Sequence, residues 1–239
     1  MFRFTSTKKI ALVATMLVST CATASYADGL KGEGTISADQ STGNSSTTDV
    51  GAGLKLNYST PTWIHDVVLA ADYGKQAGLT SKNRLFGSYQ IGRKLNKHAY
   101  VFALVSDERN RFSGFTNRFF VGAGVGDKII DGPKVDWAVE VAPGYRIDNL
   151  ITGLSNKSFA AHFGSKFRYK FNTSVSFEDD TDVNYAKVST QLINVAGITA
   201  KLSSKLAARV SYEIRHETSP AVGLKADDTV SRFSLVYGL

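Results

Sequence analysis

The chain has 239 residues, a formal net charge of +7, 11% aromatic residues and only four prolines. This composition excludes a disordered or collagen-like chain, and the length suits one folded domain. The basic residues are scattered singly along the sequence, which argues against a nucleic-acid-binding patch and predicts no nucleic-acid partner.

The first 27 residues have the pattern of a secretory signal peptide. A basic start, MFRFTSTKK, precedes an apolar stretch at residues 10–24, and small residues flank Tyr26. We expect export and cleavage after Ala27, which leaves 25 basic and 21 acidic residues and a net charge of +4. The alternatives are an N-terminal anchor helix and lipid attachment at Cys21, the single cysteine of the sequence.

From residue 28 onward, apolar and polar residues alternate with a period of two, which is typical of half-buried strands. In LAARVSYEIRHE (206–217), Val210 and Ile214 share one face, and Arg209 and Glu213 share the other. About twelve such segments follow one another, centred near residues 35, 53, 68, 87, 103, 122, 141, 163, 176, 194, 211 and 234. No apolar run in this region approaches the ~18 residues that a membrane-spanning helix needs.

The expected connections between these segments alternate in length. Short ones such as STPT (59–62) and FNT (171–173) alternate with longer or more polar ones such as GKQAGLTSK (74–82) and DDTDV (179–183). An even number of strands, with short turns at one end and longer loops at the other, is the pattern of an outer-membrane barrel. We therefore predict an all-β fold over residues 28–239: an antiparallel up-and-down transmembrane β-barrel of about twelve strands. The alternative is a soluble barrel or sandwich.

Aromatic residues lie beside the expected short turns, and the alternation continues to the last residue. The first pattern predicts an aromatic ring at the periplasmic rim of the barrel. Its members are Tyr58, Trp63, Tyr100, Trp137 and Tyr169. The second, in RFSLVYGL (232–239), predicts that the last strand pairs with the first, because an open edge is not tolerated in lipid.

Charges of both signs occupy the polar faces of the segments, which a barrel would turn toward its lumen. The expected lumen-facing charges are Lys55, Asp66, Asp72, Arg84, Glu140, Lys166, Arg168, Arg209, Glu213, Arg215 and Arg232. In a wide lumen they line a water-filled path, and in a narrow one they pair and close it. Twelve strands lie between filled small barrels and open porins, so both outcomes stay open.

Other motifs carry weaker signals. VGAGVGDK (121–128) is not followed by a helix pattern, so its glycines are expected to face inward and leave room for a ring such as Phe120 or Phe86. EDDTDV (178–183) lacks the spacing and the glycine of a calcium loop, and we expect a solvated outer tip rather than a cation site. RNRFSGF (109–115) is expected either to contact lipopolysaccharide phosphates or fold into the mouth, or to be held by its own charges.

The best fragment of a catalytic site is His216-Glu217 with the nearby Ser219. Adjacent residues of a strand point to opposite faces, so these side chains are not expected to converge. We therefore expect no enzyme activity, and no cofactor or metal.

Several short motifs occur together in a characteristic order. They are STGN (41–44), ERNRFSG (108–114), VGAGVG (121–126), APGYR (142–146), and SPAVGLKADDT (219–229) before LVYGL. In this order they resemble the salt-induced outer-membrane protein family, a domain of unknown function. The resemblance covers most of the mature chain and implies an outer-membrane β-barrel associated with salt or osmotic stress, without catalytic residues to carry over. One departure is Leu239, where outer-membrane strands commonly end in Phe.

Together, these features predict a monomeric barrel in the outer membrane of a Gram-negative bacterium. Its expected partners are the barrel assembly machinery, outer-membrane lipid and lipopolysaccharide. Two functions stay open. The first is a narrow passive pore for small solutes or ions, linked to salt or osmotic stress. The second is a closed structural or surface-interaction barrel without transport activity.

Overall fold

The computed structural model describes residues 29–44, 47–76 and 78–239, so the expected signal peptide lies outside the described residues. Within these ranges the chain forms twelve strands and one short 3-10 turn, η1 (Arg111–Ser113). The strands are β1 (Leu30–Thr42), β2 (Thr47–Ser59), β3 (Trp63–Gln76), β4 (Leu79–Lys94), β5 (Ala99–Asn110), β6 (Phe115–Asp131), β7 (Val135–Leu150), β8 (Ser155–Lys170), β9 (Val175–Ala186), β10 (Gln191–Lys201), β11 (Leu206–Glu217) and β12 (Asp227–Gly238). No helix in the described part of the chain is long and apolar enough to cross a membrane.

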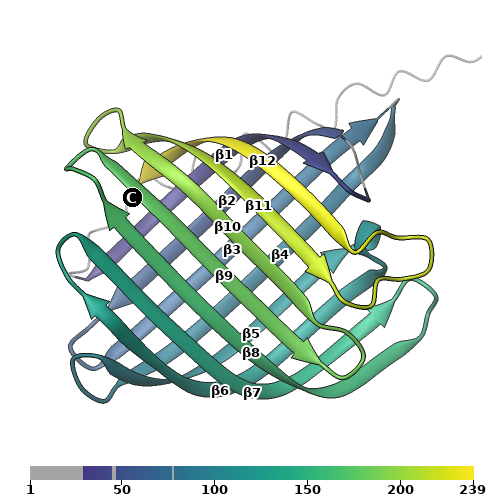
Figure 1. Cartoon of the computed structure of the whole chain (residues 1–239), viewed down its shortest axis with the longest axis horizontal. Coiled ribbons are helices and arrows are strands. Elements are labelled where there is room, and N and C mark those ends of the chain that lie inside the picture. The colour runs from purple at the N-terminus through teal and green to yellow at the C-terminus, as the bar shows by residue number, and fades with distance from the viewer. Residues whose placement is uncertain (1–28, 45–46, 77) are drawn as a thin grey trace, which may run out of the picture.

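The strands form one closed sheet. Each strand runs antiparallel to the one before it, and β12 returns to pair with β1 (Figure 1). At this seam Ile36 lies opposite Leu235, and the Leu239 N–H donates to the Gly32 carbonyl oxygen at 2.9 Å. Closure leaves no unpaired strand edge. The predicted antiparallel up-and-down barrel of twelve strands is therefore confirmed, including the pairing of the last strand with the first.

The two ends of the barrel differ less than the sequence predicted. One end, which we call the turn end, holds Leu30, Leu239 and the connections 60–62, 95–98, 132–134, 171–174 and 202–205. The opposite end, the loop end, holds the described connection residues 43–44, 78, 111–114, 151–154 and 187–190 and the longest connection, 218–226. The expectation of several long outer loops was wrong, because strand pairing continues through most of those segments, for example as far as Gln76 opposite Leu79.

EDDTDV (178–183) is the clearest case of such a segment. It lies inside β9 and is not an outer tip, contrary to the prediction. The neighbouring strand β8 explains this placement. Asp180 lies opposite Lys166 in the strand register, and the Asp180 carboxylate accepts a hydrogen bond from the Arg168 guanidinium at 3.1 Å. Asp179 points outward. Glu178, Asp180 and Asp182 point inward, where Arg168 and His162 of β8 contact them.

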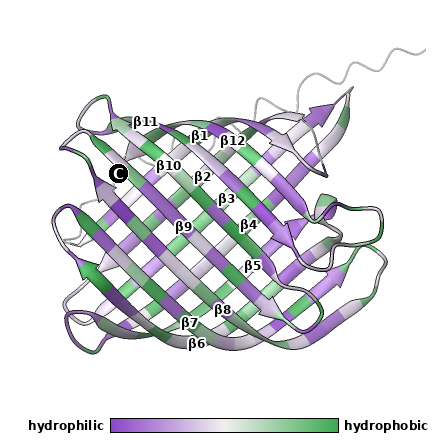
Figure 2. Ribbon diagram, viewed as in Figure 1, coloured by the Kyte–Doolittle hydropathy of each residue, from purple (hydrophilic) through white to green (hydrophobic). Residues whose placement is uncertain are grey.

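Apolar side chains cover the outer surface of the barrel, and the alternation is visible along the strands in Figure 2. Every strand contributes a large hydrophobic side chain that is at least 38% exposed. One from each strand, in chain order, is Ile36, Val50, Leu69, Leu85, Val101, Val125, Val141, Phe163, Tyr185, Ile198, Val210 and Phe233. Burial is thus reversed relative to a water-soluble fold, in which such side chains are the ones most often enclosed.

The interior combines many buried polar groups with two small apolar clusters. One cluster contains Tyr100, Phe102 and Ala142, and the other contains Phe120, Ala160 and Ala186. A Cβ atom at Gly122 or at Gly144 would lie 2.7 Å from the Phe120 ring. The prediction that inward glycines make room for this ring is confirmed, and the ring fills the lumen beside β6 and β7.

Candidate functional site

The barrel interior gathers most of the ionisable side chains, and it is the candidate site. All eleven charges expected to face the lumen project inward, on the side of the wall opposite the exposed apolar residues. The structure separates most of them into a buried group toward the loop end and a water-accessible group toward the turn end. Glu140 and Asp66 lie near the second group.

The buried group forms what we call the closing layer. Its members are Asp39, Asp72, Arg84, Glu108, Glu213, Arg215 and Arg232. Arg232 is its centre: the guanidinium lies 2.6 Å from Asp39, 2.8 Å from Asp72 and 3.2 Å from Glu213. These three carboxylates come from β1, β3 and β11, so one side chain joins strands that are distant in the sequence.

The closing layer also crosses the lumen. Arg84 of β4 lies 3.2 Å from Asp72 and 2.9 Å from Glu108 of β5. Glu108 is in turn 3.1 Å from Arg215, which projects from β11 and also pairs with Glu213. Charge-assisted hydrogen bonds therefore run from one wall of the barrel to the other.

A second set of ion pairs lies beside the layer, between β6, β7 and β11. Arg118 is 2.9 Å from Asp148 and 2.8 Å from Glu217. Arg146, only 1% exposed, is 3.0 Å from Asp148 and donates to the Ser189 carbonyl oxygen at 2.7 Å. Our sequence analysis missed Arg118, Arg146 and Asp148. Their parity within the strands is the signal that would have found them.

The side chains of the closing layer are buried against one another at this level of the lumen. The Asp39 and Asp72 side chains are 0% and 2% exposed, and that of Arg84 is 8% exposed. On the loop-end side lies a pocket of about 40 Å³, lined by Arg84, Arg232 and loop residues that include Ser113. It has room for a few water molecules and no more. Of the RNRFSGF segment, Phe112 and Ser113 line this pocket, whereas Arg109 is 68% exposed and lies 3.6 Å from Asp107.

Toward the turn end the lumen holds water-accessible charges, which we call the inner basin. Its members are Glu33, Lys55, Lys166, Arg168, Glu178, Asp180 and Arg209. The Lys55 and Lys166 side chains are both 46% exposed, and that of Arg168 is 36% exposed. Lys55 on β2 reaches Asp180 on β9 across the lumen at 3.7 Å, whereas Arg209 holds Glu33 at 2.9 Å.

Tyr100 is a correction to the expected aromatic ring. It points into the lumen, is 8% exposed, and donates a hydrogen bond to Glu140 at 2.6 Å. It shares the inward face of β5 with Phe102, and it lies opposite Gly126, where a side chain would collide with its ring. Glu140 also accepts a hydrogen bond from Gln90 at 2.8 Å and lies 3.6 Å from Lys166.

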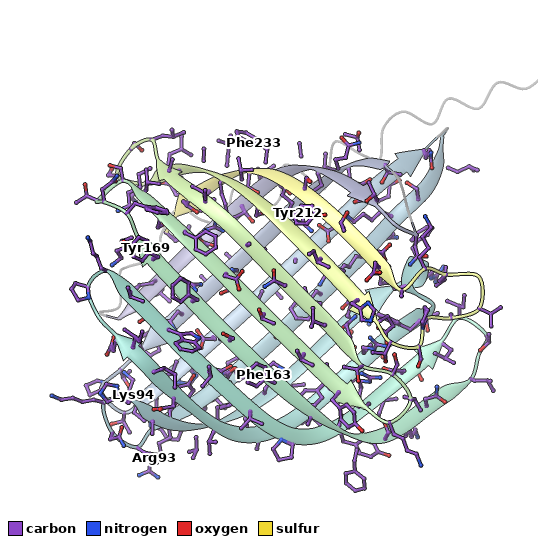
Figure 3. The ribbon with its side chains drawn as sticks, in the orientation of Figure 1. Arg93, Lys94, Phe163, Tyr169, Tyr212 and Phe233 are labelled. Atoms are coloured by element: carbon purple, nitrogen blue, oxygen red, sulfur yellow. The ribbon has the colours of Figure 1, made fainter. Side chains whose placement is uncertain are left out.

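The other expected rim aromatics lie on the outer wall near the turn end. We call Tyr58, Trp63, Trp137 and Tyr169 the aromatic band. Trp63 is 43% exposed, and the Trp137 indole donates to Ser165 on the outer face of β8 at 3.1 Å. Figure 3 shows Tyr169 at the turn end, and Phe163, Tyr212 and Phe233 farther along the outer wall.

The suspected catalytic fragment is split by the wall. His216 faces outward and lies 2.7 Å from Asp227, whereas Glu217 faces inward and accepts hydrogen bonds from Arg118. The two side chains therefore do not form an acid–base pair. Within the described ranges, no group of three or more His, Cys, Asp or Glu side chains is arranged to hold a metal ion.

Comparison with known protein families assigns most of this chain to one family. Residues 34–239 match the family described as "Protein of unknown function, DUF481". The chain belongs to this family. The match begins at residue 34, within β1, and runs to the last residue, so it includes the closing layer and every member of the inner basin except Glu33.

Individual relatives of this DUF481 protein are distant. The uncharacterized protein YdiY of Escherichia coli (strain K12) is 20% identical over 167 residues, which are 68% of this chain and 66% of that protein. The NanC porin structure is 10% identical with a TM-score of 0.59, over 86% of this chain and 100% of that one. The translocator domain of the autotransporter NalP from Neisseria meningitidis is 12% identical with a TM-score of 0.51, over 95% and 92%. These likenesses establish the barrel fold.

Proposed function

We propose that the protein is an integral outer-membrane β-barrel whose lumen is a narrow passive path for small ions or solutes, closed in this conformation by the closing layer. The observation that carries the proposal is the reversed burial. All twelve strands expose large apolar side chains outward, while charged residues fill the interior. In water such an exterior is unfavourable by roughly 25 cal/mol per Å² of apolar surface, whereas in lipid it is the expected boundary.

The dimensions and termini of the strands agree with membrane insertion. The strands contain 11 to 17 residues, and about 9–11 tilted residues suffice to cross a bilayer. The aromatic band lies near one end of the wall, as an interfacial belt does. With both described termini at the turn end, we place that end in the periplasm and the longest connection, 218–226, outside.

A closed barrel without transport is the second candidate, and one observation favours it. The carboxylates of Asp39 and Asp72 are almost completely buried by their partners, so the layer leaves no space for a hydrated ion. The two candidates differ in whether the layer opens. The side chains of the layer are polar and carry charges of both signs. Water and ions enter a lining of this kind when the contacts between its side chains rearrange.

Single-channel recording of the refolded protein in a planar bilayer tests the path. We expect small, discrete conductance steps in potassium chloride. Replacing Lys55 and Lys166 by glutamine is expected to shift the reversal potential toward cation selectivity, because it removes two water-accessible positive charges from the inner basin. The matched control replaces Lys75 and Lys157, which are exposed outside the lumen, and should leave the reversal potential unchanged.

Conductance of a closing-layer variant distinguishes a pore from a closed barrel. Replacing Glu213 and Arg215 together by alanine keeps the net charge and removes two members of the closing layer, so a pore would conduct more. A detergent-stable barrel without steps, both unmodified and with this double substitution, would establish the closed alternative and contradict the pore.

Asp179 provides an independent test of the lipid-facing surface. It projects from the outer wall, where its carboxylate accepts hydrogen bonds from Asn194 at 3.1 Å and from Thr181. Asp179→Asn is expected to raise the free energy of unfolding in lipid vesicles by about 1 kcal/mol, because a charge is removed from a hydrocarbon-facing position. Urea titration in vesicles measures this change. A clear destabilisation would place this wall in a polar environment and contradict the proposal.

The proposal includes the cellular setting expected from the sequence. We propose cleavage after Ala27, insertion by the barrel assembly machinery, a monomeric state, and contact of the loop end with lipopolysaccharide. The link to salt or osmotic stress follows from the family resemblance. Its test is the amount of the protein in outer-membrane fractions before and after the addition of sodium chloride or of an isosmotic amount of sucrose.

A further inference from the structure

The longest connection of the barrel, residues 218–226 between β11 and β12, meets the opposite wall at the loop-end mouth. A Cβ atom at Gly114, in the connection between β5 and β6, would lie 2.6 Å from the Ala221 Cβ and 3.3 Å from the Leu224 Cδ1. β11 is the sixth strand from β5 in either direction around the closed sheet, so the two connections belong to opposite walls. Figure 1 shows residues 218–226 as the yellow loop at the right-hand end of the barrel. We call this segment the crossing loop.

The two walls beneath the crossing loop also lie close together. Arg118 of β6 is 2.8 Å from Glu217 of β11. Glu108 of β5 is 3.1 Å from Arg215, which is also in β11. These ion pairs fix the separation of the walls at the level where the crossing loop begins. A short connection therefore reaches Gly114, and the narrow part of the lumen continues to the outer end of the barrel.

Both ends of the crossing loop are held by hydrogen bonds to neighbouring connections. At the first end, the Thr218 N–H donates to the Thr190 carbonyl oxygen at 2.9 Å, and the Thr190 N–H donates to the Thr218 hydroxyl at 2.8 Å. At the second end, the Asn44 side-chain amide donates to the Lys225 carbonyl oxygen at 3.0 Å, and the Lys225 N–H donates to the Asn44 side-chain oxygen. The crossing loop is thus attached to the connections β9–β10 and β1–β2.

The middle of the crossing loop is held differently. In the described part of the chain, the only hydrogen bond of residues 220–223 is internal: the Ala221 carbonyl oxygen accepts from the Leu224 N–H at 2.9 Å. The contact with the opposite wall consists of the apolar Ala221 and Leu224 side chains beside Gly114, while Val222 points away and is fully exposed. An apolar contact of this size is lost at a small cost in free energy, so the middle separates from Gly114 more readily than the ends leave their partners.

Small spaces lie between the crossing loop and the closing layer. A cavity of about 20 Å³ is lined by Leu224 of the crossing loop, Ser113 of η1 and Arg215 of the closing layer. The 40 Å³ pocket described above shares Ser113 and Arg215 with this cavity and extends to Arg232 and to Val230, which is 4% exposed. Spaces of this size hold a few water molecules. The crossing loop and η1 therefore cover the loop-end side of the closing layer.

We propose that the crossing loop is a lid that controls the access of solutes from the loop-end side to the closing layer. It opens when Ala221 and Leu224 separate from Gly114, while the hydrogen bonds at Thr218 and Lys225 keep both ends attached. The inference rests on the proposed function and adds a second closure to the same lumen. Passage through the barrel then requires two events, the opening of the lid and the rearrangement of the closing layer.

Cysteine labelling beneath the lid tests the proposal without relying on conductance. The reporter is Val230→Cys in protein refolded from residues 28–239, which otherwise contain no cysteine. The reagent, 2-sulfonatoethyl methanethiosulfonate, is larger than the pocket and reaches this thiol from the loop-end side only when the lid is open. Into the reporter protein we introduce Leu224→Ser, Leu224→Ala or, as the matched control on the outer side of the same loop, Val222→Ser. Mass spectrometry follows the rate of modification in detergent micelles.

We expect Leu224→Ser to raise the rate of modification on the order of tenfold, because the rate follows the population of the open lid. Leu224→Ala keeps the Cβ atom and should give an intermediate rate. Val222→Ser should stay within about twofold of the reporter protein. Equal rates in all four proteins would overturn the proposal. A rise for Val222→Ser as large as that for Leu224→Ser would also overturn it, because the contact with Gly114 would then not control access.

Single-channel recording separates the lid from the proposed pore. In a conducting barrel, Leu224→Ser should lengthen the open periods at least severalfold, whereas Val222→Ser should leave them unchanged. Open periods that are the same in both variants would contradict the lid. A complete lack of conductance steps in every variant would contradict the pore, and the rates of cysteine modification would still decide whether the crossing loop opens.

Discussion

Replacing Arg232 by methionine is expected to lower the free energy of unfolding of the barrel by about 3–5 kcal/mol. Methionine keeps an unbranched, flexible stem but removes the cation that lies 2.6 Å from Asp39 and 2.8 Å from Asp72. Both carboxylates are buried; Asp39 would be left with uncompensated charge, and Asp72 would keep only Arg84 as an ion-pair partner. Urea titration in detergent micelles, followed by tryptophan fluorescence, measures the loss.

Two variants sharpen this prediction. Arg109→Met removes an arginine that is 68% exposed and has one carboxylate partner at 3.6 Å, and we expect a change within about 0.5 kcal/mol. Adding Asp39→Asn to Arg232→Met should recover part of the lost free energy of unfolding, because the unpaired buried charge of Asp39 is removed. Equal losses for Arg109→Met and Arg232→Met would show that the closing layer does not stabilise the barrel.

Gly124→Ala is expected to lower the free energy of unfolding by about 3 kcal/mol, because the strands β6 and β7 approach closely at this residue. A methyl group there would overlap the Val141 carbonyl oxygen and lie 2.6 Å from the Ala142 Cα. Both obstacles are backbone atoms, which cannot rotate away as a side chain can. Pro143, which has no N–H to donate, follows at the same place and limits the adjustment of β7.

The matched control is Gly34→Ala in β1. A Cβ atom at this position meets nothing within 4 Å, so the substitution should change stability by less than about 0.5 kcal/mol. Both variants are measured by urea titration under the same conditions. A small effect at Gly124 would mean that the two strands separate without penalty, and the close approach would lose its structural importance.

The parity of residues along a strand was the most informative feature of the sequence. It assigned Asp72, Glu140 and Arg209 to the inner face, because each strand alternates strictly between lumen and exterior. The same rule places Tyr100 inside with Phe102. The error there came from reading its position beside a turn as evidence for the rim, although its parity and the opposite Gly126 both indicate the lumen.

Partners across the lumen were beyond the reach of the sequence. Glu108 meets Arg215, and Lys55 meets Asp180, only after the sheet has closed with a particular stagger between its strands. Local composition also misled: EDDTDV resembles a loop, yet cations on the neighbouring strand accommodate its inward carboxylates. Topology likewise brings residues as distant in sequence as Lys31 and Lys201 to the same end of the barrel.

The seam between β1 and β12 has a consequence for the order of folding. Ile36 and Leu235 are separated by nearly the whole chain, whereas all other neighbouring strands are joined by short connections. Closing so long a loop carries the largest chain-entropy penalty in the sheet, so hairpins form before the seam. Until β12 arrives, the growing sheet has two unpaired edges that can recruit other chains. The final strand therefore ends the period in which the chain is most prone to aggregation.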